Sequence, residues 1–559
     1  MALLLPQQQA VRPAQRLDLA GPGSASSLSG DAEGGLAAVA WVDSSRGAPR
    51  VLVSISHDTG LTWTAATVVD ADFSGADKLL VADAVEVMDE EIRILWLDER
   101  NGAGSHDLYF RASRDGGLTW APELRLDTGG APGSADVNFF RSRSSTSGAA
   151  IAVAAIVSGL PGGDEVRMLR SVDGGASFGA STLLHAGGVV ARLDLDRHDA
   201  ELHLVWMDDS AVAGFNSAYY QHSFDDGLSW LAAAPMISDT VNTHPSELRI
   251  AADAARVCVV FQDLFVIHAV GYNLSLDNGA TWLPAAKRLA GSRSPTTTPA
   301  EPQIFLGPLD VLVCWSDDRS TPGFLTPWLA GTRNGGASWQ EVQLDAGFGV
   351  APRIQGDEAD GSFAVQWNGG AQARSSGSRA ANPHTLPAFT VAGGATGSSA
   401  LLDVSHRYDS AYAHHLAFWL DQDGAGHRQV WVGGYRIPNV MMLGSGQAGT
   451  PITFRALQFR EADAGREFRV LLSGDQGSAP LPFHDGRSTG LAADAWLSFS
   501  TRSMALRGAL AADGSGLTTS VSIPTSLSPG TRVWFNAVVF DAAARAFGDL
   551  ADARSLVVQ

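Results

Sequence analysis

The sequence of 559 residues predicts an all-β protein made largely of repeated units. Three observations indicate this fold class. A motif of the form Ser-x-Asp-x-Gly-x-x-Trp recurs six times, apolar runs that end in an aromatic and an acidic residue precede most copies, and Gly- and Asp-rich turns separate the runs. A fixed spacing of this kind is typical of a repeat architecture, in which each unit buries its apolar face against the next.

Successive copies of the motif start 57, 58, 52, 52 and 57 residues apart. Each copy lies between two β-rich apolar runs, which is the setting of a hairpin turn. We therefore expect six equivalent turns. The copies are SHDTGLTW at 56–63, SRDGGLTW at 113–120, SVDGGASF at 171–178, SFDDGLSW at 223–230, SLDNGATW at 275–282 and TRNGGASW at 332–339.

Each residue type of the motif has a structural role in such a turn. Asp and Ser or Thr accept hydrogen bonds from backbone N–H groups, and Gly adopts the positive φ that the turn needs. The aromatic residue is a large apolar anchor for packing against the neighbouring repeat. The departures are mild, with Phe178 in place of Trp, and Thr332 and Asn334 in place of Ser and Asp. We expect these turns to stabilise the fold and not to carry catalysis.

On these residues the chain resembles the Asp-box, or BNR-repeat, β-propellers of the sialidase-like family. The resemblance implies a ring of four-stranded blades, with the motifs on the face opposite the family's active site. It also implies an extracellular or cell-surface location. Residues 1–10 (MALLLPQQQA) lack the basic start and the longer apolar core of a signal peptide, so the location rests on the resemblance.

The number of repeats follows from the apolar runs. They continue beyond the sixth motif, which gives eight units, and residues 13–21 (PAQRLDLAG) resemble the outer strand at 121–130 that the last unit lacks. We predict an eight-bladed β-propeller over 12–437 that the N-terminal strand closes, with seven blades as the alternative. The runs are AVAWVD at 38–43, IRILWLDER at 92–100, IAVAAIVS at 151–158, LHLVWMDD at 202–209, VCVVFQD at 257–263, LVCWSDDR at 312–319, FAVQWN at 363–368 and LAFWLDQD at 416–423.

The composition changes after Pro438. Residues 444–450 (GSGQAGT) have the composition of a flexible joint, so we expect a linker at 438–450. Alternating apolar segments with Gly, Ser and Asp turns follow, as in 468–472, 517–523 and 533–540. Short strands at this spacing predict a C-terminal β-sandwich over 451–559.

Bulk composition excludes several partners. The formal net charge of −20 and the pI of about 5.0 argue against nucleic acid and against anionic membrane surfaces. No run of 18 apolar residues is present, so no membrane span is expected. Cys258 and Cys314, the only cysteines, are expected to be buried free thiols. Lys78 and Lys287 are the only lysines.

Candidate ligand-binding residues fall in two sets that we expect to converge at one mouth of the propeller. The loop after each aromatic–acidic run opens on the face opposite the motif turns, and each innermost strand starts there. The first set is Asp98, Glu99, Arg100, Asp208, Asp209, Asp263, Asp317, Asp318, Arg319, Asp421 and Asp423. The second set is Asp136, Asn138, Arg141, Arg143, Asn242, His244, Glu301, Arg353 and Arg407.

Carboxylates interspersed with arginines suit sugars, Ca²⁺ or a basic partner. No loop has the spacing of a known Ca²⁺ motif, so no metal ligand is assigned and Ca²⁺ is the one cofactor kept open. The structural alternative for any single residue is a turn cap or an ion pair between blades, because aspartates after strands often have these roles. Convergence of many residues is therefore the stronger argument for a site.

The resemblance implies a sialidase site with three arginines that bind the substrate carboxylate, a tyrosine nucleophile with a glutamate partner, and an aspartate acid/base. Arg141, Arg353 and Arg407 can supply such arginines. Of the tyrosines only Tyr408 and Tyr412 lie near the expected mouth, and neither has an evident glutamate partner. The family's Arg-Ile-Pro motif is also missing from the first repeat. The sequence thus identifies no complete catalytic set.

Three functions stay open, and so does the oligomeric state. The leading interpretation is a non-catalytic propeller that binds a glycan or a cell-surface protein. The first alternative is a carbohydrate-active enzyme, either a glycoside hydrolase with a carboxylate pair or a polysaccharide lyase, for which His244 is the candidate base. The second alternative is a structural subunit of a surface assembly.

Overall fold

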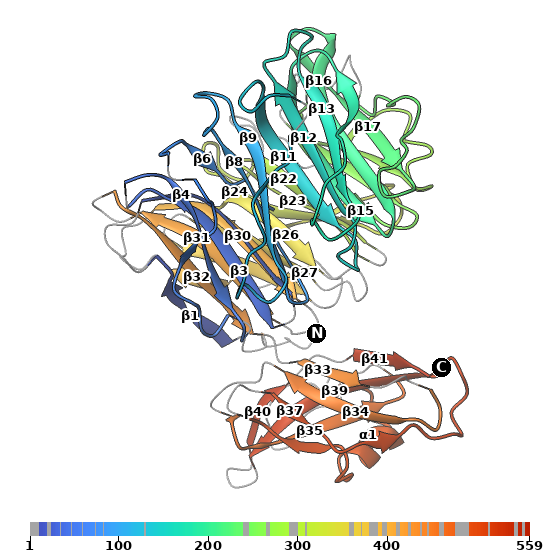
Figure 1. Cartoon of the computed structure of the whole chain (residues 1–559). Coiled ribbons are helices and arrows are strands. Elements are labelled where there is room, and N and C mark those ends of the chain that lie inside the picture. The colour runs from blue at the N-terminus through green and yellow to red at the C-terminus, as the bar shows by residue number, and fades with distance from the viewer. Residues whose placement is uncertain are drawn as a thin grey trace. The chain divides into compact units, whose positions relative to one another are not determined.

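The computed structural model describes most of the chain between residues 10 and 558 (Figure 1). It divides into two compact units, one comprising 13–408 with 416–433 and the other mainly 434–559. The described residues are 10–18, 24–33, 35–45, 47–58, 60–72, 74–81, 83–127, 130–238, 245–263, 269–289, 300–307, 310–356, 363–369, 372–378, 389–393, 400–409, 414–422, 426–436, 439–443, 447–457, 463–475, 491–511, 515–541, 546–550 and 554–558.

The prediction of an all-β chain is confirmed. Within the described ranges the one α-helix is α1 (Ala495–Ser500), and every other named element is a strand. No helix among these residues is both long enough and apolar enough to cross a membrane.

The strands of residues 10–436 that the structure describes form eight antiparallel sheets, numbered here in chain order by their first strands. In most of these sheets the strands pair in chain order; in sheet 2 the first two strands both pair with the third, and in sheet 8 the N-terminal strand of the chain pairs with the last strand of the sheet. Sheet 1 is β2 (Ala25–Glu33), β3 (Leu36–Asp43), β4 (Arg50–Ser56) and β5 (Thr67–Val68); sheet 2 is β6 (Lys78–Leu79), β7 (Val85–Met88), β8 (Glu91–Asp98), β9 (Asp107–Ser113) and β10 (Leu124–Arg125); sheet 3 is β11 (Asp136–Ser144), β12 (Ile151–Ser158), β13 (Glu165–Ser171) and β14 (Thr182–Ala186); sheet 4 is β15 (Val190–His198), β16 (Glu201–Val212) and β17 (Phe215–Ser223).

Sheets 5 to 8 repeat this pattern. Sheet 5 is β18 (Pro245–Ala252), β19 (Val257–Asp263), β20 (Ala269–Ser275) and β21 (Lys287–Arg288); sheet 6 is β22 (Ala300–Leu306), β23 (Val311–Asp317), β24 (Thr326–Thr332) and β25 (Gln340–Gln343); sheet 7 is β26 (Val350–Gly356), β27 (Phe363–Asn368), β28 (Gln372–Ser378) and β29 (Phe389–Gly393); sheet 8 is β30 (Ala400–Asp409), β31 (His414–Gln422), β32 (Arg428–Arg436) and β1 (Ala10–Arg16).

The second strand of each sheet is apolar because both of its faces are covered by neighbouring sheets. All residues of β3, β19 and β23 are buried. The aromatic residue near the end of the strand is the largest buried side chain: Trp41, Trp96, Trp206, Trp315 and Trp419 are at most 1% exposed. The aromatic–acidic run is thus the sequence signature of a strand between two packed sheets.

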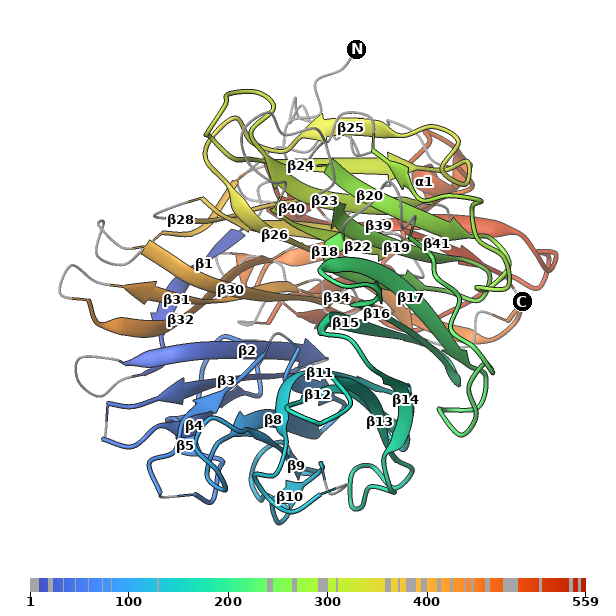
Figure 2. The ribbon, with the colours of Figure 1, turned by 90° about the horizontal axis from the view of Figure 1, so that it is seen from above.

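Successive sheets pack face to face around a centre. One core joins Ala154 and Met168 of sheet 3 to Leu195 and Trp206 of sheet 4, and similar cores join sheets 4 to 7 pairwise. First strands contact one another in the pairs β2–β7, β11–β15, β15–β18, β18–β22 and β22–β26. In Figure 2 the sheets follow one another around the centre as the colour passes from blue through green and yellow to orange. These sheets are arranged as the blades of a β-propeller.

The repeated motif forms the same turn in each of its six copies. In the first, the Ser56 Oγ accepts a hydrogen bond from the Gly60 N–H (2.8 Å), and the Asp58 Oδ1 accepts one from the Thr62 N–H (2.8 Å). Gly60 has a φ of 83°, in the left-handed region that glycine adopts most easily. These bonds satisfy the backbone donors of the turn, so the motif residues are structural.

The aromatic residue of the motif packs on the preceding sheet. The ring centroids of Trp282 and Tyr220 are 4.9 Å apart, and those of Trp339 and Tyr272 are 5.1 Å apart, both pairs in edge-to-face contact. Trp63 makes the same kind of contact with Phe418, which links sheet 1 to sheet 8. Each turn therefore ties its own sheet to its neighbour.

The N-terminal strand completes the last sheet. β1 pairs with β32, and the Leu17 N–H donates to the Val430 carbonyl at 2.9 Å. Ala25 and Trp41 of sheet 1 share a core with Leu416, Phe418 and Val430 of sheet 8. The two ends of the repeat array thus lie together in this unit.

The C-terminal unit contains two sheets over one core. Val440, Phe454 and Ala456 of the first sheet pack with Phe468 and Phe535 of the second. The first sheet has β33 (Asn439–Leu443), β34 (Pro451–Leu457), β37 (Gly516–Leu517) and β38 (Val521–Ser522), and the second has β35 (Glu467–Ser473), β36 (Arg507–Ala509), β39 (Arg532–Asp541), β40 (Ala546–Leu550) and β41 (Arg554–Val557).

Part of the segment expected to be a linker, 438–450, is a strand instead. β33 pairs with β34 over its full length, and Val440 is completely buried. The alternation of Val440 and Met442 toward the core accounts for the difference, because a half-buried strand needs only a few such residues.

Candidate functional site

The carboxylates that follow the second strands lie inside their own sheets. Asp98, Asp208, Asp263 and Asp317 are all 0% exposed. The Trp206 Nε1–H donates to Asp208 (2.8 Å), and the Trp315 Nε1–H donates to Asp317 (2.7 Å). These four carboxylates therefore do not form an open ring for a ligand. In sheets 4 and 6 the carboxylate thus serves as the buried acceptor that the indole N–H of the tryptophan two residues earlier needs.

Arg319 of the first set and Arg288, which the sequence analysis did not select, bind two of these same carboxylates. Arg319 pairs with Asp317 (2.7 Å) and Glu341 (2.6 Å), and its guanidinium lies 4.0 Å from the centroid of the Trp328 ring. Arg288 pairs with Asp263 at 2.6 Å. Charge-assisted bonds and stacking on an aromatic face suit a planar guanidinium. These contacts join the second, third and fourth strands within one sheet.

Sheet 2 repeats the arrangement at Arg100. Its guanidinium pairs with Asp98 (2.6 Å) and with Glu123, and lies 4.0 Å from the centroid of the Tyr109 ring. The same triad of acid, arginine and aromatic residue in sheets 2 and 6 indicates a structural role for both. Asp98, Arg100, Asp208, Asp263, Asp317 and Arg319 are accordingly not placed in the candidate site.

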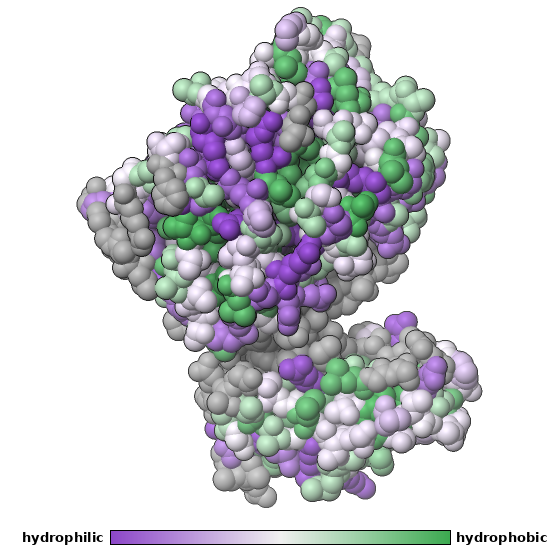
Figure 3. All heavy atoms as spheres, in the orientation of Figure 1, coloured by the Kyte–Doolittle hydropathy of each residue, from purple (hydrophilic) through white to green (hydrophobic). Residues whose placement is uncertain are grey.

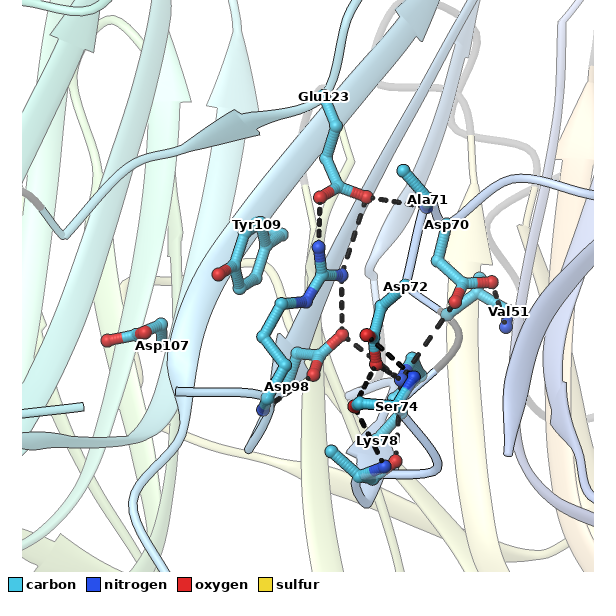
Figure 4. Close-up of polar contacts among 12 residues, drawn as sticks. Val51, Asp70, Ala71, Asp72, Ser74, Lys78, Asp98, Asp107, Tyr109 and Glu123 are labelled. Carbon is cyan, nitrogen blue, oxygen red and sulfur yellow. Dashed lines mark hydrogen bonds and ion pairs between the residues drawn. The ribbon is translucent and has the colours of Figure 1, made fainter. Parts of the chain in front are cut away.

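A buried lysine extends the network of sheet 2 toward sheet 1. The Lys78 Nζ lies 2.8 Å from Asp72, 3.3 Å from Asp98 and 3.9 Å from Asp70, and the lysine side chain is 0% exposed (Figure 4). Arg50 of sheet 1 also pairs with Asp70, at 2.9 Å. On the surface, hydrophilic side chains gather where Figure 1 labels β6, β8 and β9 (Figure 3).

Two carboxyl groups, those of Asp107 and Asp127, interact at the edge of this network. Asp127, which follows β10, accepts the Leu108 N–H at 3.0 Å, and Asp107 accepts bonds from Asn101 (2.6 Å) and from the Gly133 N–H (3.1 Å). Burial, together with the hydrogen bond and the charge of Asp107, raises the pKa of Asp127 to about 7. The pair therefore carries one negative charge below neutral pH and two above it.

We expect the substitution D127N to remove a pH dependence of stability. Because the pKa of Asp127 is higher in the folded than in the unfolded state, its contribution is present at low pH and is lost as the pH rises through about 7. The amide of the substituted side chain would still accept the Leu108 N–H and would donate to Asp107. Between pH 5.5 and 8.5 the wild type should lose about 2 kcal/mol relative to D127N in urea unfolding. Parallel pH profiles for the two proteins would contradict the raised pKa of Asp127.

The second predicted set is only partly brought together. Arg141, Arg143 and Arg353 lie on first strands, around the centre of the sheets. Asp136 does not join them, because it accepts the His106 backbone N–H at 2.8 Å. His244 lies outside the described residues, as do the side chains of Glu301 and Arg407, although their backbones belong to β22 and β30.

The arginines of the first strands surround Asp83. Its Oδ2 is 4.0 Å from both Arg141 and Arg143, while Arg141 pairs with Asp194 at 3.1 Å. Burial opposes the ionisation of Asp83, but the charges of Arg141, Arg143, Arg249 and Arg353 lower its pKa to about 2. The Asp83 side chain is nevertheless 48% exposed. The Asp83 carboxylate is therefore reached by water while it lies among arginine side chains.

A break in the first strand of sheet 2 places Asp83 there. β6 ends at Leu79 and β7 begins at Val85, and the Leu95 N–H donates to the Ala84 carbonyl at 2.9 Å. Asp83 has a φ of 63°, which is rare for a residue with a Cβ. Such strain is concentrated at functional sites, so it supports a role for Asp83 beyond the sheet.

Arg249 is the residue of the cluster that the sequence analysis missed. Its guanidinium donates to the Leu248 carbonyl at 2.7 Å, and no carboxylate among the described side chains lies within 4.0 Å of it. Burial and then the charge of Arg141 lower its pKa to about 10, with a lesser effect of Arg353, while the charges of Asp194 and Glu247 oppose this shift. The positive charge of Arg249 is thus disfavoured where it stands, and a bound anion would stabilise it.

The strand register contained a signal for Arg249. In five sheets one polar first-strand residue pairs with the residue directly before the buried aromatic residue of the second strand. The position of the aromatic residue in the second strand therefore identifies the polar first-strand residue opposite it. The start of the first strand does not identify that residue. The pairs are Ser29 with Ala40, Asp194 with Val205, Arg249 with Val260, Gln303 with Cys314 and Arg353 with Gln366.

No protein-family model and no curated protein sequence matches the chain. Among solved structures it is similar to a sialidase of Trypanosoma rangeli, at 10% identity and a TM-score of 0.32 over 79% of this chain and 90% of that one. It is also similar to a β-xylosidase/α-arabinofuranosidase from a compost microbial metagenome (11% identity, TM-score 0.26, 44% and 90% covered). A third is an α-L-arabinofuranosidase of Podospora anserina (10%, 0.25, 44% and 90%).

Proposed function

We propose that the eight sheets close into an eight-bladed propeller that binds an acidic glycan in its central channel without cleaving it, outside the cell or at its surface. The observation that carries the proposal is Arg249, a cation without a carboxylate partner among the described side chains, next to Arg141 and Arg353. Three guanidinium groups from three different blades fit a carboxylate or sulfate group better than lysines would, because each offers a planar pair of donors.

Two features favour a ligand in which a single small acidic group binds the arginine cluster and the rest of the molecule is neutral or acidic. The chain as a whole has a net charge of −20, so a positive site is confined to the cluster and does not attract polyanions along the surface. Asp83 already supplies one negative charge among the arginines, so a ligand with a single acidic group suits the cluster better than a polyanion. The resemblance of the repeats to sialidase-like propellers makes acidic sugars the ligands to test.

Four of the tyrosines lie away from the arginine cluster, whereas the side chains of Tyr408 and Tyr412, the two expected near the mouth, lie outside the described residues. Tyr109, Tyr219, Tyr220 and Tyr272 lie on the third strands β9, β17 and β20, one strand further from the centre than the second strands. Tyr220 contacts His203 and Trp282, and Tyr109 contacts Arg100. None of these four offers a nucleophile to the arginine cluster.

The test is binding of sialyllactose, oligogalacturonate and a sulfated disaccharide by calorimetry, with mass spectrometry of the mixtures. We expect R249Q to weaken binding of the preferred ligand about 10- to 100-fold, the usual range for a charged hydrogen bond. Arg502, an exposed arginine of the C-terminal unit, supplies the control R502Q, which should bind as the wild type does. Equal affinity of R249Q and wild type, or no binding by either, contradicts the proposal. A cleaved or unsaturated sugar would favour a hydrolase or a lyase instead.

A further inference from the structure

Three metal-ligating side chains converge in sheet 4, away from the arginine cluster. Glu201 and His203 lie at the start of β16, and His222 lies near the end of β17, where it pairs with His203. The Nε2 atoms of His203 and His222 are 3.9 and 3.8 Å from the Glu201 Oε2. One ligand atom from each residue lies within 4.8 Å of the other two.

The two imidazoles are buried without partners for these atoms. His203 is 0% exposed and His222 is 2% exposed, and neither Nε2 has a hydrogen-bond partner among the described residues. The rings are stacked with centroids 4.2 Å apart. A buried nitrogen without a partner costs free energy, and two that face the same carboxylate are better explained by a shared ligand than by chance.

Neighbouring groups orient the ligands. The His203 Nδ1 lies 2.8 Å from the Tyr220 hydroxyl, so a proton on Nδ1 leaves the Nε2 lone pair directed toward Glu201. Asn278, in the motif turn of sheet 5, donates to the Glu201 Oε2 at 2.7 Å. Hydrogen bonds of this kind fix the tautomer and the carboxylate in protein metal sites.

We propose that Glu201, His203 and His222 bind a divalent transition metal ion, with Zn²⁺ as the best fit. Two imidazoles and one carboxylate are a common zinc ligand set, whereas Ca²⁺ and Mg²⁺ prefer oxygen ligands throughout. Bonds of about 2.0–2.2 Å require the three ligand atoms to move closer together than they lie in this structure. The Glu201 side chain is 26% exposed, so water reaches one of the three ligands.

The ion would link sheet 4 to the turn of sheet 5 through Glu201 and Asn278, which gives it a stabilising role independent of the channel. The site lies on the second and third strands, whereas the proposed glycan site lies on the first strands. Loss of one site therefore leaves the other testable.

The test uses the full chain, freed of metal with EDTA and titrated with ZnCl₂ by calorimetry. We expect one Zn²⁺ per chain, a rise in the midpoint of thermal unfolding, and the visible absorption of tetrahedral Co²⁺ when cobalt replaces zinc. E201Q and H222Q should each weaken zinc binding at least tenfold and abolish the thermal shift. H57Q, at an exposed histidine in the first motif, should keep both.

Two results would overturn the proposal. One is a wild type that binds no zinc at micromolar concentrations. The other is a stoichiometry and thermal shift that E201Q and H222Q share with the wild type. E201Q keeps the test decisive if H222Q does not fold, because Glu201 is partly exposed and glutamine retains its acceptor for Asn278.

Discussion

Replacing Lys78 with methionine is expected to destabilise the propeller unit by about 3–5 kcal/mol, the range for removing one partner of a buried ion pair. The lysine is wholly buried and faces Asp70, Asp72 and Asp98. Methionine fills a similar volume but leaves Asp72 without its cation. Arg50 still pairs with Asp70, and Arg100 still pairs with Asp98, so the loss concentrates at Asp72.

The chain supplies a matched control in its one other lysine. Lys287 is exposed on β21, and K287M should change the free energy of unfolding by less than about 0.5 kcal/mol. Urea unfolding of both variants at pH 7.5 and pH 4.5 measures the difference. The defect of K78M should shrink at the lower pH, where the abandoned carboxylate can take up a proton. Equal midpoints for K78M and K287M would show that the buried charges contribute nothing.

Replacing Gly279 with alanine should cost about 3 kcal/mol through two effects. Gly279 has a φ of 81°, where a Cβ is strained. The added Cβ would also lie 2.1 Å from the Tyr220 hydroxyl oxygen, and the Tyr220 ring is fully buried. Since that hydroxyl contacts His203, we also expect G279A to weaken zinc binding.

Gly214 separates the two effects. It has nearly the same φ, 79°, but a Cβ there would meet nothing within 4 Å. G214A should therefore show the backbone strain alone, about 1–2 kcal/mol. The difference between the two variants in urea unfolding measures the contact with Tyr220. A G279A protein as stable as G214A would mean that the tyrosine moves aside without cost.

Sequence alone was sufficient for those features that are local and repeated. The residues of the motif bond to one another within eight positions, so Ser56, Asp58 and Gly60 reveal their turn without knowledge of the rest of the chain. The aromatic–acidic runs likewise revealed buried strands. The role of their acidic residues was open. Only the structure shows that Asp208 accepts the hydrogen bond of the Trp206 indole N–H.

The arginine cluster depends on long-range geometry, which explains why the sequence analysis only partly predicted it. Arg141, Arg249 and Arg353 come from sheets 3, 5 and 7 and are brought together by the packing of all the sheets between them. Asp83 depends on an irregular first strand that no periodicity reveals. His203 and His222 were predictable in part, since the motif fixes Ser223 opposite Leu202 and so sets the next pair.

The pairing of β1 with β32 also means that sheet 8 cannot be completed until nearly the whole propeller unit has been synthesised. The first strand leaves the ribosome at residue 16, but its partner is complete only at residue 436. At 5–20 residues per second the wait lasts roughly 20–80 s. Throughout that interval β1 has no pairing partner, and the face of sheet 1 that packs on sheet 8 is exposed. Folding in the cell should therefore depend on a factor that binds the unpaired strand, and premature termination before residue 428 should leave an aggregation-prone intermediate.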